Sequence, residues 1–188
     1  MNIKNSWKLE ICLLVVDLMV IFLIAAWVVG LRVNITTSLP KGIYRLSSED
    51  IERGDLVAFC LPPDNPFSSL AGERGYLGPG RCSNGLRPLL KHLVGLPGDD
   101  LQIGNDELIL NGVRLVGSKR PKLDRHGRDL PPSLLNDGLI PDGHVLVLAQ
   151  EHVGSFDSRH FGLISFSSLY KVKPILIFGD APHQPQGD

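Results

Sequence analysis

The sequence lacks an excess of basic charge. Its 188 residues carry 19 lysines and arginines against 20 aspartates and glutamates, for a formal net charge of −1. Nucleic-acid binding depends largely on a positive field that neutralises phosphates, and this chain has none to offer. We therefore predict no nucleic-acid partner. The hydrophobic content of 43% suits one folded globular domain with an appendage.

Several catalytic motifs are also missing. The six histidines form no H-E-x-x-H, and the sequence contains neither a G-x-S-x-G nucleophile elbow nor a glycine-rich phosphate loop. We predict no metal ion and no cofactor. A Ser-His-Asp triad that uses His160 stays open as an alternative, although no motif specifies it.

Cysteine is scarce, with three in the chain. Cys12 lies in an apolar run, where it is interpreted as a small apolar side chain. Cys60 and Cys82 flank a Pro/Gly-rich segment, and in an oxidising compartment a disulfide closing this loop is the economical interpretation. Free thiols are the alternative. A zinc site is disfavoured, because it would need more ligands than lie nearby in sequence.

Long hydrophobic runs are absent except for residues 11–31, which only Asp17 interrupts. About 20 apolar residues suffice for a helix to cross a bilayer. A cleavable signal peptide normally has an apolar region of about 7 to 15 residues, so an uncleaved anchor is the better interpretation. Lys4 and Lys8 favour a cytoplasmic N-terminus, and Arg32 weakens that asymmetry. Asp17 is interpreted as a tolerated charge, with contact to another membrane helix as the alternative.

Beyond the anchor the chain changes to short β-rich runs separated by turn residues. Strand-length segments begin at Gly42, Asp55, Leu89, His144 and Lys173. Asn111-Gly112 between apolar runs predicts a hairpin, because both turn residues must take positive φ. We expect an all-β, antiparallel sandwich or partly closed barrel over residues 34–180, after a tail and anchor over 1–33 and before a flexible tail over 181–188. The charged, proline-broken stretch 119–132 is expected on the surface.

Three separated segments carry candidate catalytic residues. In the first, residues 34–44, an extended strand would place alternate positions on one face. These positions are Asn34, Thr36, Ser38, Pro40, Gly42 and Tyr44. In the second, Lys91 stands in an apolar run, where desolvation would lower its pKa and make it a base. A lysine on an edge strand that reaches solvent is the alternative. The third, residues 154–164, gathers Ser155, Asp157, Ser158 and Arg159.

Together these segments resemble the bacterial signal-peptidase family, in particular its conjugative-transfer, TraF-type branch. Residues 34–44 match the N-x-T-x-S-x-P-x-G-x-Y pattern of that branch at every fixed position. Lys91 with the V-G-L-P-G-D run at 94–99 resembles the family's lysine box, and residues 155–159 resemble its S-x-D-S-R box. The paired cysteines also resemble the conjugative branch.

The resemblance implies a serine endopeptidase with a Ser-Lys dyad. Ser38 would attack the scissile carbonyl, and Lys91 would accept its proton and pass it to the leaving amine. The backbone N–H of Ser38 and the hydroxyl of Thr36 would hold the oxyanion.

The third segment would support this dyad. Ser155 would orient the Lys91 amine, and Asp157 and Arg159 would form an ion pair behind it. Two departures from the general signal peptidases favour the conjugative type. Their Gly-Asp-Asn run is replaced by residues 149–152, and the methionine after their nucleophile is replaced by Leu39.

The resemblance also implies a single-pass protein of the bacterial inner membrane, with a periplasmic catalytic domain and lipid contact through residues 11–31. Its protein substrate would be a secreted precursor, and the branch implies the conjugative pilin, whose ends it can join into a ring. The alternatives are a general type I signal peptidase and a non-enzymatic, membrane-tethered module of the conjugation apparatus. An autoproteolytic Ser-Lys switch protein is disfavoured by the anchor and by the lack of a DNA-binding domain.

Overall fold

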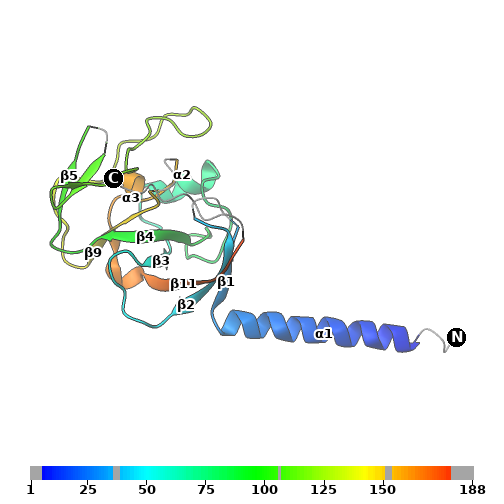
Figure 1. Ribbon diagram of the computed structural model, residues 1–188. Coiled ribbons are helices and arrows are strands. Elements are labelled where there is room, and N and C mark those ends of the chain that lie inside the picture. Colours follow the sequence, from blue (N-terminus) through cyan, green and yellow to red (C-terminus); the bar gives the residue numbers. More distant parts are fainter. Residues whose placement is uncertain (1–5, 36–38, 106, 151–153, 179–188) are drawn as a thin grey trace.

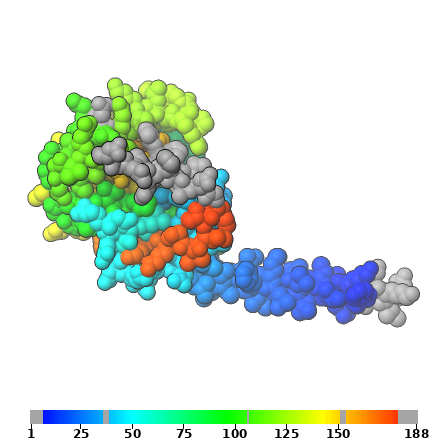
Figure 2. All heavy atoms as spheres, in the orientation of Figure 1, coloured from blue at the N-terminus to red at the C-terminus, as the bar shows by residue number. Residues whose placement is uncertain are grey.

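The protein consists of a long helix that projects from a β-rich body (Figures 1 and 2). The computed structural model describes residues 6–35, 39–105, 107–150 and 154–178. Helix α1 (Ser6–Val28) contains a 22-residue stretch, Trp7–Val28, that is long and apolar enough to cross a membrane and lies outside the body. The predicted apolar helix is confirmed, but it is displaced toward the N-terminus from the apolar run at 11–31, since it spans residues 6–28. It ends earlier because Gly30 takes a φ of +82° and Leu31 already pairs in a sheet.

The body confirms the all-β prediction, with two antiparallel sheets among the described residues. The larger sheet has seven strands in the order β1-β2-β11-β3-β4-β9-β10, and the smaller has four in the order β7-β6-β5-β8. The strands are β1 (Leu31–Asn34), β2 (Gly42–Ser47), β3 (Leu56–Phe59), β4 (Leu89–Gly95), β5 (Asp100–Ile103), β6 (Leu108–Leu110), β7 (Val113–Arg114), β8 (Gly138–Leu139), β9 (His144–Leu148), β10 (Ile164–Ser165) and β11 (Tyr170–Ile177). Short helical segments are α2 (Phe67–Glu73), α3 (Ser158–Phe161) and the 3₁₀ turn η2 (Phe166–Ser168).

The predicted strand segments correspond to β2, β3, β4, β9 and β11. The predicted hairpin joins β6 and β7, where Asn111 and Gly112 take φ values of 53° and 78°. Residues 34–44, by contrast, do not form one strand. Asn34 of β1 pairs with Gly42 of β2, so the chain reverses between them and the shared strand face does not form. Thr36 and Ser38 lie outside the described residues.

Strand β4 alternates between buried and half-buried positions, and Lys91 takes one of its buried positions between Leu89 and Leu93. The two leucines belong to a core that also includes alternate residues of β3 and β9 and the aromatic Phe161. Because β4 pairs with β3 on one side and β9 on the other, it is an interior strand of the sheet. The Lys91 side chain therefore lies in the core and not at a sheet edge.

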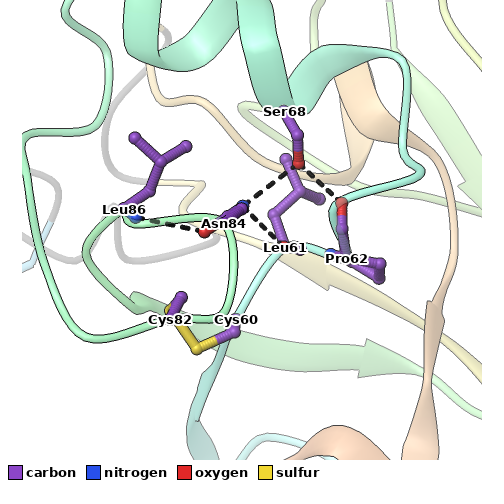
Figure 3. The surroundings of a disulfide bond; sticks show 7 residues. All are labelled: Cys60, Leu61, Pro62, Ser68, Cys82, Asn84 and Leu86. Atoms are coloured by element: carbon purple, nitrogen blue, oxygen red, sulfur yellow. Dashed lines mark hydrogen bonds between the residues drawn. A yellow bond between two sulfur atoms is a disulfide. The ribbon is translucent and has the colours of Figure 1, made fainter.

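A disulfide between Cys60 and Cys82 closes the Pro/Gly-rich segment, as predicted (Figure 3). The loop is also held by Asn84, whose Nδ2 donates to the Leu61 carbonyl at 2.8 Å and to the Ser68 hydroxyl at 3.2 Å. Part of the segment is ordered as α2, which the sequence did not predict. A disulfide that closes a loop of this length stabilises the folded protein by about 3 kcal/mol, because it reduces the entropy of the unfolded chain.

The excursion over residues 119–132 lies on the surface, as predicted, and packs against the disulfide-closed segment. The Tyr76 hydroxyl donates to the Asp124 carboxylate at 2.6 Å, and Arg74 donates to the Asp129 carbonyl at 2.8 Å. These polar contacts hold a segment whose sequence offers little apolar surface of its own.

Candidate active site

Lys91 is buried, with 2% of its surface exposed, and its Nζ donates a 2.7 Å hydrogen bond to the Ser155 hydroxyl. The alternative of an edge-strand lysine reaching solvent is therefore wrong, because β4 is an interior strand. Neighbouring His92 points to the other, half-exposed face of the strand. An amine in this position is held at one point in the core instead of sampling solvent.

The segment that carries Ser155 is fixed by a buried ion pair between Asp157 and Arg159, which are 0% and 1% exposed. The pair is bidentate, with Arg159 Nη2 and Nε lying 2.7 and 2.8 Å from the two Asp157 oxygens. Asp157 begins α3 and accepts a hydrogen bond from the Arg159 N–H, a typical helix N-cap. It also accepts the Ala149 N–H at 3.1 Å, which ties α3 to the end of β9.

Arg159 also contacts the loop that follows β7. Its Nη1 donates to the Gly117 and Lys119 carbonyls, both at 3.1 Å. Its Nη2 also makes a longer contact of 3.5 Å with the Ser155 carbonyl. One guanidinium thus joins the main chain at Ser155 to the loop that follows β7, so the partner of Lys91 is positioned by contacts from two sides.

The described positions of the first motif form a clamp on the turn between β1 and β2. Asn34 Nδ2 and the Tyr44 hydroxyl donate to the same carbonyl, that of Pro40, at 3.0 and 2.6 Å. Burial raises the pKa of the Tyr44 phenol, which keeps it a donor. Gly42 is required for space, since a Cβ there would lie 2.3 Å from the Leu176 carbonyl of β11. These contacts therefore fix the chain immediately before and after the segment that contains Ser38.

The lysine box ends in a turn that Asp99 organises. Its carboxylate binds the Arg53 guanidinium at 2.7 and 2.9 Å and accepts hydrogen bonds from the Leu96 N–H and from Asn111, each at 2.7 Å. The hydrogen bonds from Arg53 are the main reason that the pKa of Asp99 falls to about 2. The turn leads from β4 to β5, so this cluster connects the two sheets. The sequence analysis did not identify Arg53 and identified Asn111 only as a hairpin residue, because nothing in their spacing from Asp99 marks them as its partners.

His160 does not have the surroundings of a triad histidine. It is 3% exposed, and its Nδ1 has no hydrogen-bond partner among the described residues. A triad needs a carboxylate at that nitrogen, but Asp157 is occupied by Arg159. In the part of the chain that the structure describes, no three His, Cys, Asp or Glu side chains gather as a possible metal site.

We expect the stability of the protein to fall as the pH drops through the titration of His160. Desolvation by burial lowers its pKa from 6.5 to about 4. The unfolded chain therefore binds the extra proton first, and the free energy of unfolding should decrease from about pH 6.5 to about pH 4, by roughly 3 kcal/mol, with no contribution above this window. His160→Phe keeps a ring against Phe156 and should flatten this part of a stability curve measured by chemical denaturation. Equal slopes for the two proteins would show that His160 is not desolvated.

Residues 4–175 match the sequence profile of the family described as "Signal peptidase, peptidase S26". The chain therefore belongs to the peptidase S26 family of signal peptidases. It is 36% identical over 148 residues to the plasmid transfer protein TraF of Escherichia coli, covering 78% of this chain and 83% of the relative. It is also 36% identical to the conjugal transfer protein TraF of Agrobacterium fabrum, with 79% and 84% covered. A signal peptidase I structure from Enterococcus faecalis aligns with a TM-score of 0.39 at 24% identity, over 68% of this chain and 99% of that one.

Proposed function

We propose that the protein is a membrane-anchored serine endopeptidase in which Ser38 is the nucleophile and Lys91 the general base. The observation that supports this most is the amine of Lys91, buried in the core and hydrogen-bonded to Ser155. Only a neutral amine can accept a proton, and an apolar setting disfavours the charged form. Membership of a peptidase family and the match of residues 34–44 to the nucleophile pattern support the role of Ser38.

In the proposed reaction the Ser38 oxygen forms a bond to the scissile carbonyl carbon while its proton passes to Lys91 Nζ. Thr36 and the Ser38 N–H would stabilise the oxyanion that results. Lys91 then gives the proton to the departing amine nitrogen as the peptide bond breaks, which leaves an ester on Ser38. A second nucleophile, water or an amine, resolves the ester by the reverse sequence of proton transfers.

The remaining site residues are proposed to position this dyad. Ser155 holds the Lys91 amine, and the pair of Asp157 and Arg159 holds Ser155. Asn34 and Tyr44 would position Ser38 through their hydrogen bonds to the carbonyl of Pro40, two residues further along the chain.

Removing either donor of the Pro40 clamp should slow processing more than it destabilises the protein. Tyr44→Phe deletes the hydrogen bond to the Pro40 carbonyl, and Asn34→Ala deletes those to the Leu39 and Pro40 carbonyls. Each hydrogen bond is worth about 1 kcal/mol in unfolding free energy. Misplacing a nucleophile by about 1 Å can cost about a hundredfold in rate, so we expect a fall of about 10- to 100-fold in kcat. Single-turnover cleavage of a precursor peptide and chemical denaturation measure the two effects. Tyr170→Phe, which alters an exposed tyrosine, serves as control. A rate loss no larger than the stability loss implies would mean that the clamp is only structural.

The relatives named as plasmid and conjugal transfer proteins lead us to propose a role in conjugative transfer. The helix α1 would anchor the protein in the inner membrane, with the body in the periplasm, and the Cys60–Cys82 disulfide fits that oxidising compartment. The substrate would be a secreted precursor, the conjugative pilin, cut close to the membrane.

The pilin precursor is further proposed to be cyclised. An amine held within the same chain can reach an effective concentration of roughly 10⁵ M, so it can outcompete water for the ester on Ser38. The experiment incubates the purified full-length enzyme with the precursor and weighs the product. A ring weighs one water less than the cut linear chain and has no free N-terminus. A linear product would refute cyclisation and leave the endopeptidase, whereas uncut precursor would count against the pilin as substrate.

A further inference from the structure

Two arginines converge on one tryptophan where α1 meets the body. The guanidinium of Arg32 lies 5.6 Å from the centre of the Trp27 ring, and that of Arg81 lies 5.4 Å from it. Arg32 is anchored there by hydrogen bonds from Nη1 to the Trp27 and Leu31 carbonyls, at 3.1 and 2.8 Å. Arg81 comes from the distant loop that the disulfide closes, next to Cys82. Two separate segments thus deliver positive charge to the same point.

This pair of charges has no internal counter-charge among the described residues. The ion pairs of the body involve other lysines and arginines, and both Arg32 and Arg81 are exposed to solvent. Like charges that share one ring repel each other, and an external anion between them would remove that repulsion. Guanidinium forks match phosphate oxygens in charge and geometry.

An apolar groove continues from this cluster along the helix. It is lined by Val20, Leu23, Ile24, Trp27 and Arg81. The four helix positions follow the spacing of one helical face, so the groove runs away from the arginines along the apolar rod. Trp27 lies at the body end of the stretch Trp7–Val28, where tryptophan and arginine side chains typically meet the membrane–water interface.

We infer that Trp27, Arg32 and Arg81 bind the headgroup of an anionic glycerophospholipid, such as phosphatidylglycerol, while one acyl chain lies along Val20, Leu23 and Ile24. The groove would hold the acyl chain, and the two guanidiniums would hold the phosphate. A free phosphate ion would use the guanidiniums alone and leave the groove unused. The bound lipid would join the disulfide-closed loop to the end of α1 and so set how the body stands on the bilayer. This inference rests on the proposed membrane anchorage.

The chain contains two tryptophans, which makes a selective probe available. In a Trp7→Phe background, Trp27 is the remaining fluorophore. The full-length protein is reconstituted in phosphatidylcholine vesicles that contain a small, equal fraction of either dibrominated phosphatidylglycerol or dibrominated phosphatidylcholine, whose bromines quench indole on contact. We expect stronger quenching by the phosphatidylglycerol. Each basic residue at an anionic lipid surface contributes about fivefold in affinity, so Arg32→Gln with Arg81→Gln should abolish the preference. The matched control is Arg87→Gln, an exposed arginine five residues beyond the end of this loop at Cys82.

The outcomes separate the site from the anchorage. Equal quenching by the two lipids before any arginine is changed would overturn the lipid site and leave the anchor intact. Absence of quenching by either lipid would overturn both. If inorganic phosphate in the buffer removed the preference at constant ionic strength, the site would be a simple anion site, and the inferred lipid would be wrong. A preference that Arg87→Gln keeps and the double change abolishes supports the inference.

Discussion

Ser38→Ala and Lys91→Met should each reduce precursor cleavage by at least about 10⁴-fold in kcat/KM, and the double variant should lose little more. A nucleophile and its base act as one unit, so losing either member costs nearly as much as losing both. Methionine keeps an unbranched apolar stem between Leu89 and Leu93 and removes only the amine. Cleavage of the membrane-reconstituted precursor is followed by gel and by mass spectrometry.

A matched control separates the chemistry from folding. Lys122→Met makes the same substitution on the exposed excursion and should leave the rate unchanged. The thermal transitions of both active-site variants should stay close to that of the unaltered protein. Substantial cleavage by folded Lys91→Met would disprove the dyad. Conjugative transfer that survives Ser38→Ala would favour the non-enzymatic assembly module instead.

Asp157→Ala should be the most destabilising of the substitutions considered, by about 3–5 kcal/mol in unfolding free energy. It leaves the Arg159 guanidinium, 1% exposed, without the carboxylate that neutralises it. Unfolding by guanidinium chloride in detergent measures the loss. Glu49→Ala removes the carboxylate of an exposed pair with Lys173 and should change the unfolding free energy by less than about 1 kcal/mol.

The double variant Asp157→Leu with Arg159→Met tests the cause. If the penalty of Asp157→Ala is the uncompensated charge, removing both charges should recover much of the lost stability, because apolar replacements of a buried pair are often close to neutral. Cleavage should nevertheless remain slow, since Ser155 would no longer be held in place. A double variant as unstable as the single one would show that the hydrogen bonds to Ala149, Gly117 and Lys119 matter more than the charge.

The sequence by itself determined the local elements and the candidate chemistry. The apolar run predicts a helix because its composition leaves few alternatives, and Asn111-Gly112 predicts a hairpin because few residues accept positive φ. The signal-peptidase motifs likewise indicate which serine and which lysine to consider. Helix ends were less predictable, since α1 ends at Val28 through the backbone conformation of Gly30 and not through a change in hydropathy.

Only the tertiary structure decided which of these residues meet. Lys91 and Ser155 are 64 positions apart, and Arg53 and Asp99 are 46 apart. Asn34 and Tyr44 converge on one carbonyl because β1 and β2 reverse, and Gly42 is needed because β11 passes close behind it. The same holds for Arg81, which only the disulfide-closed loop brings to Trp27. Local patterns fix periodicity and turn type, but strand order and register depend on how distant apolar faces pack together, and that packing places the polar groups.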